Sequence, residues 1–159
     1  MAVYVSIDGI EGTATQEKHK NWIFADSLNW GVERSIAAVT GATQNREASE
    51  PSVSEITITK ETDGSSPKIF QMACGNDTKG REVKIDFVTT GNPGVTYMTY
   101  TLHNTLIAEY EISTSGELPT ETIAFNFTKV EIKYTPHDEN NKPKQSTTVV
   151  YDLTTTKVS

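Results

Sequence analysis

The sequence predicts an all-β fold, a compact β-barrel of two packed sheets with one short α-helix. Three observations support this prediction. Apolar and polar residues alternate in several separate segments, which is the period of a half-buried strand. Serine and threonine are frequent, which suits strands with one face in water. Only one segment has apolar residues at helical spacing. We expect residues 1–159 to form a single domain, because a core of this size can bury roughly 70% of the unfolded surface.

The first half of the chain contains three predicted strands and one long connection. Strict alternation predicts strands over residues 3–7 and 28–32, and the period of two returns at Ile56 and Ile58. Between residues 36 and 52 the periodicity disappears, and Gly, Thr, Gln, Asn and Glu predominate. A connection of this length is commonly functional or disordered, so we expect an extended loop there.

The single helix is predicted over about residues 66–74. Ser66 can act as the N-cap, Pro67 suits the first turn, and Gly75 can end the helix. Ile69 and Met72 are three residues apart, which gives the helix one apolar face. So short a helix is not stable alone and must dock on the sheets.

The last strands are predicted over residues 83–87, 122–135 and 149–153. In the segment 122–135 the apolar residues change parity partway along. A one-residue change of this kind moves the apolar side chains to the other face of the sheet. We favour a β-bulge near Thr128 and Lys129. The alternative is that the second half of this strand faces a subunit contact.

Composition and termini exclude several classes of protein. The formal net charge is -7 and the pI is near 4.9, so the sequence does not indicate a nucleic-acid partner. No stretch approaches the roughly 18 apolar residues of a membrane span, and the amino terminus lacks the features of a signal peptide. Cys74 is the only cysteine, so no internal disulfide can form, and we expect it to be a small buried residue.

No catalytic, metal-binding or cofactor-binding motif is present in the sequence. His19, His103 and His137 are far apart and form none of the usual metal-binding spacings. There is no nucleophile elbow, P-loop or dinucleotide fingerprint. We therefore predict no catalytic residues, no metal and no cofactor, and a protein that is not an enzyme.

Two features leave a carbohydrate-binding or hydrolytic β-sandwich as the alternative. Glu109 and Glu111 would project from one strand face, as the two carboxylates of a glycosidase can. Four aromatic residues could form a platform for sugar stacking, but packing in the core or at an interface explains them better. These residues are Trp22, Trp30, Tyr97 and Tyr100.

Short segments spread over most of the chain carry a family resemblance. They are residues 7–12, 19–20, 22–23, 29–32, 54–60, 63–67, 69–73, 102–110, 115–121 and 125–136. In this order and spacing they resemble the haemolysin-coregulated protein (Hcp) family, whose members build the tube of bacterial type VI secretion systems. Ala14 and Thr105 depart from the residues usual in the family, which leaves the subgroup and the cargo open.

The resemblance implies a structural function. Members of the family are β-barrels with one short helix that form hexameric rings, and the rings stack into a hollow tube that carries or chaperones small effectors. The implied partners are further copies of the chain, a spike protein, a contractile sheath and effectors, with no nucleic acid and no membrane insertion. The protein would be made in the bacterial cytoplasm without a signal peptide and then secreted by the type VI system. The extended loop would reach a neighbouring subunit or ring through Thr43, Gln44, Asn45, Arg46 and Glu47.

Overall fold

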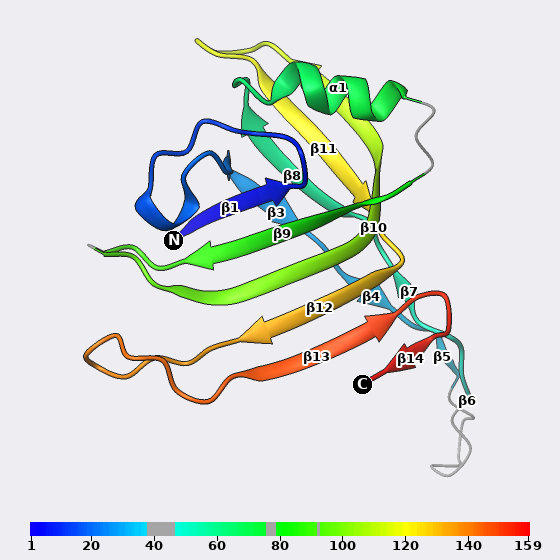
Figure 1. Cartoon of the computed structure of the whole chain (residues 1–159). Coiled ribbons are helices and arrows are strands. Elements are labelled where there is room, and N and C mark those ends of the chain that lie inside the picture. The colour runs from blue at the N-terminus through cyan, green and yellow to red at the C-terminus, as the bar shows by residue number, and fades with distance from the viewer. Residues whose placement is uncertain (38–46, 76–78, 92) are drawn as a thin grey trace.

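The computed structural model describes residues 1–37, 47–75, 79–91 and 93–159, and within this part the chain folds into two antiparallel sheets with one short α-helix (Figure 1). The predicted all-β class is confirmed. The described strands follow an open path through two sheets that share one long strand, β10, so the arrangement is not a closed barrel.

The first sheet contains the amino-terminal and carboxy-terminal strands. Its order is β2-β1-β9-β10-β12-β13-β14, and every neighbouring pair is antiparallel. Alternating burial along β1 shows why its sequence forms a strand, because every second side chain enters the core. The strands are β1 (Ala2–Ile7), β2 (Ile23–Ala25), β9 (Arg81–Val88), β10 (Thr96–Ser113), β12 (Lys129–Tyr134), β13 (Thr147–Asp152) and β14 (Lys157–Val158).

The second sheet is built on the carboxy-terminal half of β10. Its order is β10-β11-β8-β3, with β11 spanning Thr120–Asn126, β8 spanning Ile56–Glu61 and β3 spanning Ser27–Asn29. The 18-residue β10 can serve both sheets because it bends. Its pairing with β9 shifts register between Leu102 and Thr105, and Asn104 has a positive φ of 52°.

The change of parity in the segment 122–135 coincides with a break between two strands. β11 ends at Asn126 and β12 begins at Lys129. Asn126 pairs with Leu106 of β10, and Lys129 pairs with His103 of β10. The register with β10 is therefore the same on both sides of the break, and the bulge predicted near Thr128 and Lys129 was wrong in its position. A register shift is found instead in β10 itself, between Ile107 and Glu109. Because the backbone leaves the strand conformation at residues 127 and 128, side chains of both parities reach the core.

The core lies between the two sheets and beneath the helix. It is dominated by β-branched residues, which pack well on pleated surfaces. Its best-buried members, each with 0% of its surface exposed, are Val5, Ile23, Ile56, Ile58, Ile69, Val83, Ile85, Leu102, Ile123 and Phe125.

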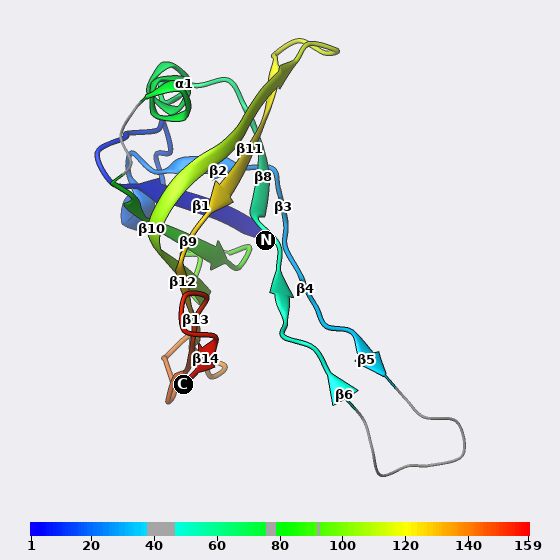
Figure 2. The ribbon, with the colours of Figure 1, turned by 90° about the vertical axis from the view of Figure 1, so that its right-hand side faces the viewer.

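Two short ladders lead away from the sheets and form what we call the arm (Figure 2). In the first ladder β4 (Val32–Glu33) pairs with β7 (Ser52–Val53), and in the second β5 (Ile36–Ala37) pairs with β6 (Glu47–Ala48). The segment 36–52, which lacks periodicity in the sequence, therefore begins and ends in paired strands. This is possible because the hydrogen bonds of a strand pair are made by the backbone and need no particular side chains.

The helix α1 spans Ser66–Cys74, as predicted. Its N-cap is Ser65, which makes no side-chain capping bond, so the prediction of Ser66 as the cap was wrong. Cys74 is exposed at the end of α1, so the prediction that it is buried was also wrong.

A short 3-10 helix, η1, spans Glu17–His19. Neither described helix is long and apolar enough to cross a membrane.

Candidate functional site

The predicted interface residues belong mostly to the part of the chain that the structure does not describe. Thr43, Gln44, Asn45 and Arg46 fall outside the described residues. Glu47 begins β6, where its backbone pairs with Ala37. The structure therefore describes the base of the arm, and the contact made by residues 43–47 stays a prediction.

The described residues do not bring the three histidines together. His19 is buried in η1, with its Nε2 atom 2.8 Å from a carboxylate oxygen of Asp86. The Nε2 atom of His103, in β10, is 3.6 Å from Glu131 on the adjacent strand β12. Over residues 1–37, 47–75, 79–91 and 93–159, no cluster of three His, Cys, Asp or Glu side chains could hold a metal ion.

The two features behind the carbohydrate alternative are not assembled into a site. Glu109 and Glu111 are both exposed on the projecting end of β10. Trp22 packs edge-on against His19, with ring centroids 4.8 Å apart. Trp30 instead packs against Tyr100, at 5.4 Å. The aromatic residues thus stabilise two separate regions by edge-to-face contacts, and no observation favours a sugar-stacking platform.

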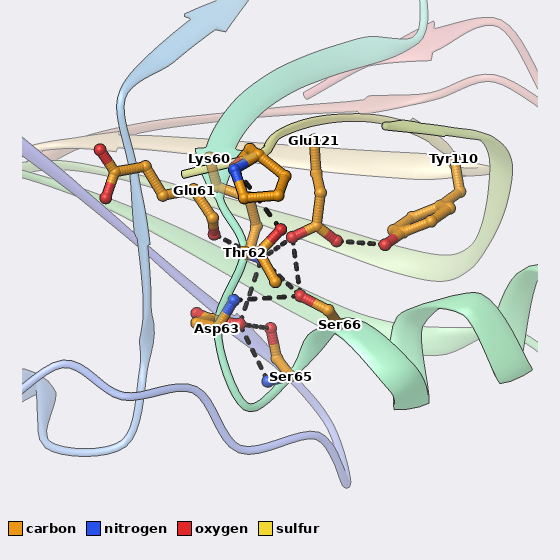
Figure 3. A network of polar contacts seen from close by, with 9 residues as sticks. Lys60, Glu61, Thr62, Asp63, Ser65, Ser66, Tyr110 and Glu121 are labelled. Atoms are coloured by element: carbon orange, nitrogen blue, oxygen red, sulfur yellow. Dashed lines mark hydrogen bonds and ion pairs between the residues drawn. The ribbon is translucent and has the colours of Figure 1, made fainter. Parts of the chain in front are cut away.

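A buried polar network joins β8, α1, β10 and β11 (Figure 3). Lys60 and Glu121 are both 0% exposed, and they lie directly opposite each other in the β8–β11 ladder. The Lys60 Nζ atom donates to Glu121 Oε2 at 2.8 Å and lies 3.1 Å from Asp63 Oδ1. Ser66, the first residue of α1, donates to the same carboxylate oxygen at 2.7 Å, and Tyr110 donates to the other oxygen. All charges in this network are therefore paired, as burial requires.

The network shifts the pKa values of two of its groups. Burial by itself raises the pKa of Glu121, but hydrogen bonds from Lys60, Tyr110 and Ser66, together with the charge of Lys60, outweigh it and lower the pKa below the usual value. For Tyr110, burial, the hydrogen bond to Glu121 and nearby negative charge raise the pKa to about 12. The stable state is an ionised Glu121 beside a neutral Tyr110.

Sequence reasoning missed this network, although a signal was present. Lys60 continues the inward parity of Ile56 and Ile58, and Glu121 has the inward parity of Ile123 and Phe125. Charged residues of opposite sign at core-facing positions of two strands indicate a buried pair. The pairing of the strands could not be read from the chain, so the partners could not be matched. The network is structural, because it fixes the start of α1 to the root of the β10–β11 hairpin.

An apolar groove, called the groove below, lies between the base of the arm and the first sheet. Its volume is about 240 Å³. Its rim includes exposed Val32, Val149 and Val158, whose exposed fractions are 61%, 43% and 69%. The nine lining residues are Trp30, Val32, Pro51, Val53, Val130, Ile132, Val149, Tyr151 and Val158.

The opposite end of the molecule exposes a second set of apolar side chains. The β10–β11 hairpin projects past α1, away from the arm and the carboxyl terminus (Figures 1 and 2). We call residues 112–118 the hairpin tip. Ile112 and Leu118 are 52% and 54% exposed there, and Phe70 on α1 is 56% exposed. A contiguous exposed apolar surface is typical of a contact with another protein, and the lining of the groove is such a surface.

The structure thus defines a class: an all-β protein of two sheets that share a long strand, with a projecting arm and apolar surface at both ends. The chain matches the protein family described as "Type VI secretion system effector, Hcp" over residues 4–134. The chain belongs to this Hcp family, in agreement with the resemblance of its sequence segments.

Solved structures show the same fold along nearly the whole chain. A structure described as a type six secretion system protein is 23% identical, with 99% of each chain covered and a TM-score of 0.88. Hcp1 from Salmonella typhimurium is 22% identical, with 99% of this chain and 98% of that chain covered and a TM-score of 0.76. A type VI secretion system effector from Yersinia pestis is 24% identical, with 94% and 98% covered and a TM-score of 0.73. A comparison with curated proteins found no match.

Proposed function

We propose that this chain is a structural subunit of the type VI secretion tube. It forms hexameric rings that stack, carries or chaperones effectors in the lumen, and is itself exported. Membership of the Hcp family supports a function in type VI secretion. The similarity to an Hcp structure over nearly the full chain supports the proposal that this chain is also a tube subunit.

The observation that carries the assembly is the difference between the two ends of the molecule. The arm lies at one end, and the β10–β11 hairpin and α1 lie at the other (Figure 2). The groove is lined by residues at the base of the arm and on β12, β13 and β14. A ring or stack made by head-to-tail docking needs two distinct surfaces on each subunit, whereas a two-fold dimer needs only one. In the same proposal, residues 43–47 contact a neighbouring subunit or ring, and residues 1–159 form one domain.

The partners and location follow from the same assignment. Further copies, the spike protein, the contractile sheath and small effectors are the proposed partners, and the protein is made in the cytoplasm and secreted by the type VI system. The net charge of -7 supports the absence of a nucleic-acid partner, because phosphates would repel it. The mechanism is mechanical, and no enzymatic step is assigned to the chain.

The test is the native mass of the purified protein, measured together with negative-stain images of the same fraction. A species of six subunits that appears as rings supports the proposal. A monomer over a wide concentration range, with no rings, contradicts it.

Deletion of residues 40–48 tests the role of the arm separately. We expect the rings to remain and the stacking of rings to weaken. Unchanged tubes in this variant would refute a stacking contact through the arm.

A further inference from the structure

We propose that His19 is a proton-dependent latch, which holds the connection between β1 and β2 against the outer face of the first sheet. The connection covers residues 8–22 and includes η1. His19 belongs to one of the sequence segments that resemble the Hcp family, and the proposed function gives it no role. The inference concerns a single subunit and goes beyond that function.

The backbone of the connection forms a closed turn. The Gly12 amide donates to the backbone oxygen of Asn21 at 2.7 Å, and the Asn21 amide donates to the oxygen of Ala14 at 2.9 Å. The Ala14 amide in turn donates to the oxygen of Trp22 at 3.0 Å. These bonds lie within the connection, so they close the turn but do not attach it to the sheet.

His19 is the side chain that attaches this turn to the sheet. Of residues 11–20 it alone is buried, with 2% of its surface exposed. Its ring stacks on the ring of Tyr4 in β1, with centroids 4.7 Å apart and planes 8° apart. Its Nε2 atom lies 2.8 Å from Asp86 Oδ2 on β9. Tyr4 and Asp86 are opposite each other in the β1–β9 ladder, so one side chain bridges two strands.

Both ring nitrogens of His19 face oxygen atoms that accept hydrogen bonds. Nδ1 lies 2.6 Å from Gln16 Oε1, and the same oxygen accepts from the backbone amide of Lys18 at 3.1 Å. The amide of Lys18 fixes that Gln16 atom as the oxygen, which has no hydrogen to donate. Nε2 faces the carboxylate of Asp86, whose other oxygen accepts from Thr99 at 2.8 Å. Both nitrogens must therefore donate, and only the positively charged imidazole has two donors.

The surroundings of His19 favour a positive charge on its ring. The side chain of Asp86 is 14% exposed, so water and salt screen its negative charge only weakly. The face of an aromatic ring such as that of Tyr4 also attracts a cation. The ion pair and the stacked ring therefore act in the same direction.

Other charged groups lie farther from the His19 ring. On β9, Lys84 precedes Asp86 by two residues and lies 3.7 Å from Glu82. On β12, Lys133 is opposite Thr99 in the ladder with β10. The charged residues of the turn beside His19 are exposed, and these are Glu17, Lys18 and Lys20. Within the described part of the chain, Asp86 is the charged group at ion-pair distance from His19.

Loss of one proton from His19 removes one of its two hydrogen bonds. A neutral ring presents a lone pair to an oxygen atom, and Asp86 loses its cation. In an open connection the ring would contact water and could be neutral without this cost. The closed form therefore binds the proton more tightly than the open form, so closure is favoured as the pH falls and weakens as the pH rises. Histidine is the side chain whose charge ordinarily changes near neutral pH.

Nitrogen NMR spectra of histidine-labelled protein test the protonation of the ring. The His19 signals are assigned by their loss in His19→Gln protein. At about pH 6 we expect both ring nitrogens of His19 to bear hydrogen. A spectrum in which one of them lacks hydrogen would overturn the inference.

Hydrogen exchange measured by mass spectrometry tests the latch itself. Exchange of a peptide covering residues 12–22 is compared at about pH 6 and about pH 9, relative to the unfolded chain at the same pH. We expect protection of this peptide to fall roughly tenfold, the equivalent of one lost hydrogen bond to a charged group, while β10 keeps its protection. The pKa of Glu121 is lowered, so the buried network stays ionised over this range.

Three variants separate the latch from a general effect of pH. His19→Gln should have low protection at both pH values, and Asp86→Asn should move the loss of protection to lower pH because the ion pair is gone. His103→Gln is the matched control, since that histidine lies 3.6 Å from a carboxylate on β12 and should leave the wild-type behaviour unchanged. Equal protection of the wild-type peptide at both pH values, or a fall of equal size in His19→Gln protein, would overturn the inference.

Discussion

Replacing Lys60 with methionine tests whether the buried network stabilises the fold. Lys60 Nζ is held by Glu121 Oε2 at 2.8 Å, by the backbone oxygen of Glu61 at 3.0 Å, by Asp63 Oδ1 at 3.1 Å and by Ser66 Oγ at 3.3 Å. Methionine has a similar length and no charge. The change therefore removes the only cation that contacts Glu121 in the described part of the chain, while the volume of the site is nearly kept.

The expected cost follows from what remains behind. Glu121 stays fully buried and keeps only the hydrogen bonds from Ser66 and Tyr110. Removing one partner of a buried ion pair typically costs about 3–5 kcal/mol. Native proteins have about 5–15 kcal/mol of total stability, so this loss is large. With an m-value of about 2 kcal/mol/M, the midpoint of urea unfolding should fall by about 2 M.

The assay is urea unfolding at two protein concentrations, because self-association would make the apparent stability depend on concentration. Lys84→Met is the control, since Lys84 lies 3.7 Å from Glu82 with both side chains about half exposed. Such surface pairs contribute about 0–1 kcal/mol. Adding Glu121→Gln to Lys60→Met should restore part of the loss, because the unpaired charge is then removed. A loss below about 1 kcal/mol for Lys60→Met would refute the reasoning.

Three further predictions concern the same network and the bend in β10. Glu121 has a folded-state pKa below its unfolded value, so its stabilising contribution is complete above the unfolded pKa and is lost as the pH falls through the folded pKa. The free energy of unfolding should therefore decrease below about pH 5, and Glu121→Gln should flatten this part of the urea-unfolding profile. Tyr110→Phe should cost about 1.5–3 kcal/mol in the same assay, because it removes a hydrogen bond to a charged group, and a cost near zero would contradict the network. Gly80→Ala should lower the thermal midpoint clearly, since its Cβ would lie 2.2 Å from the backbone of Asn104, whereas Gly116→Ala, with open space around it, should have little effect; equal effects would contradict the predicted clash.

Family membership and the secondary structure were accessible from the sequence for a physical reason. The strand over residues 3–7 is predicted by the alternation of apolar and polar residues, and the helix over 66–74 by the residues at its two ends. Both signals lie within a few neighbouring residues. The family segments also keep their order whatever the tertiary contacts. These features need no knowledge of which distant segments touch.

Predictions that depended on a neighbouring strand were less accurate. The bulge was assigned to Thr128 and Lys129 because only that strand's own parity was visible, whereas the register shift lies between Ile107 and Glu109 of its partner β10. Cys74 was expected in the core, but the end of α1 leaves it exposed. In both cases the outcome depends on what packs against the segment, which local sequence does not contain.

The sequence by itself therefore determined the all-β class, the single helix and the Hcp family, because periodicity and segment order are properties of the chain alone. Only the tertiary structure decided that Lys60 meets Glu121, which are 61 residues apart, and that Trp30, Val53 and Val149 line one groove. The physical reason is that strand pairing brings distant residues together through backbone hydrogen bonds that are the same for every side chain. Which strands pair, and therefore which distant residues meet, depends on the packing of the whole fold.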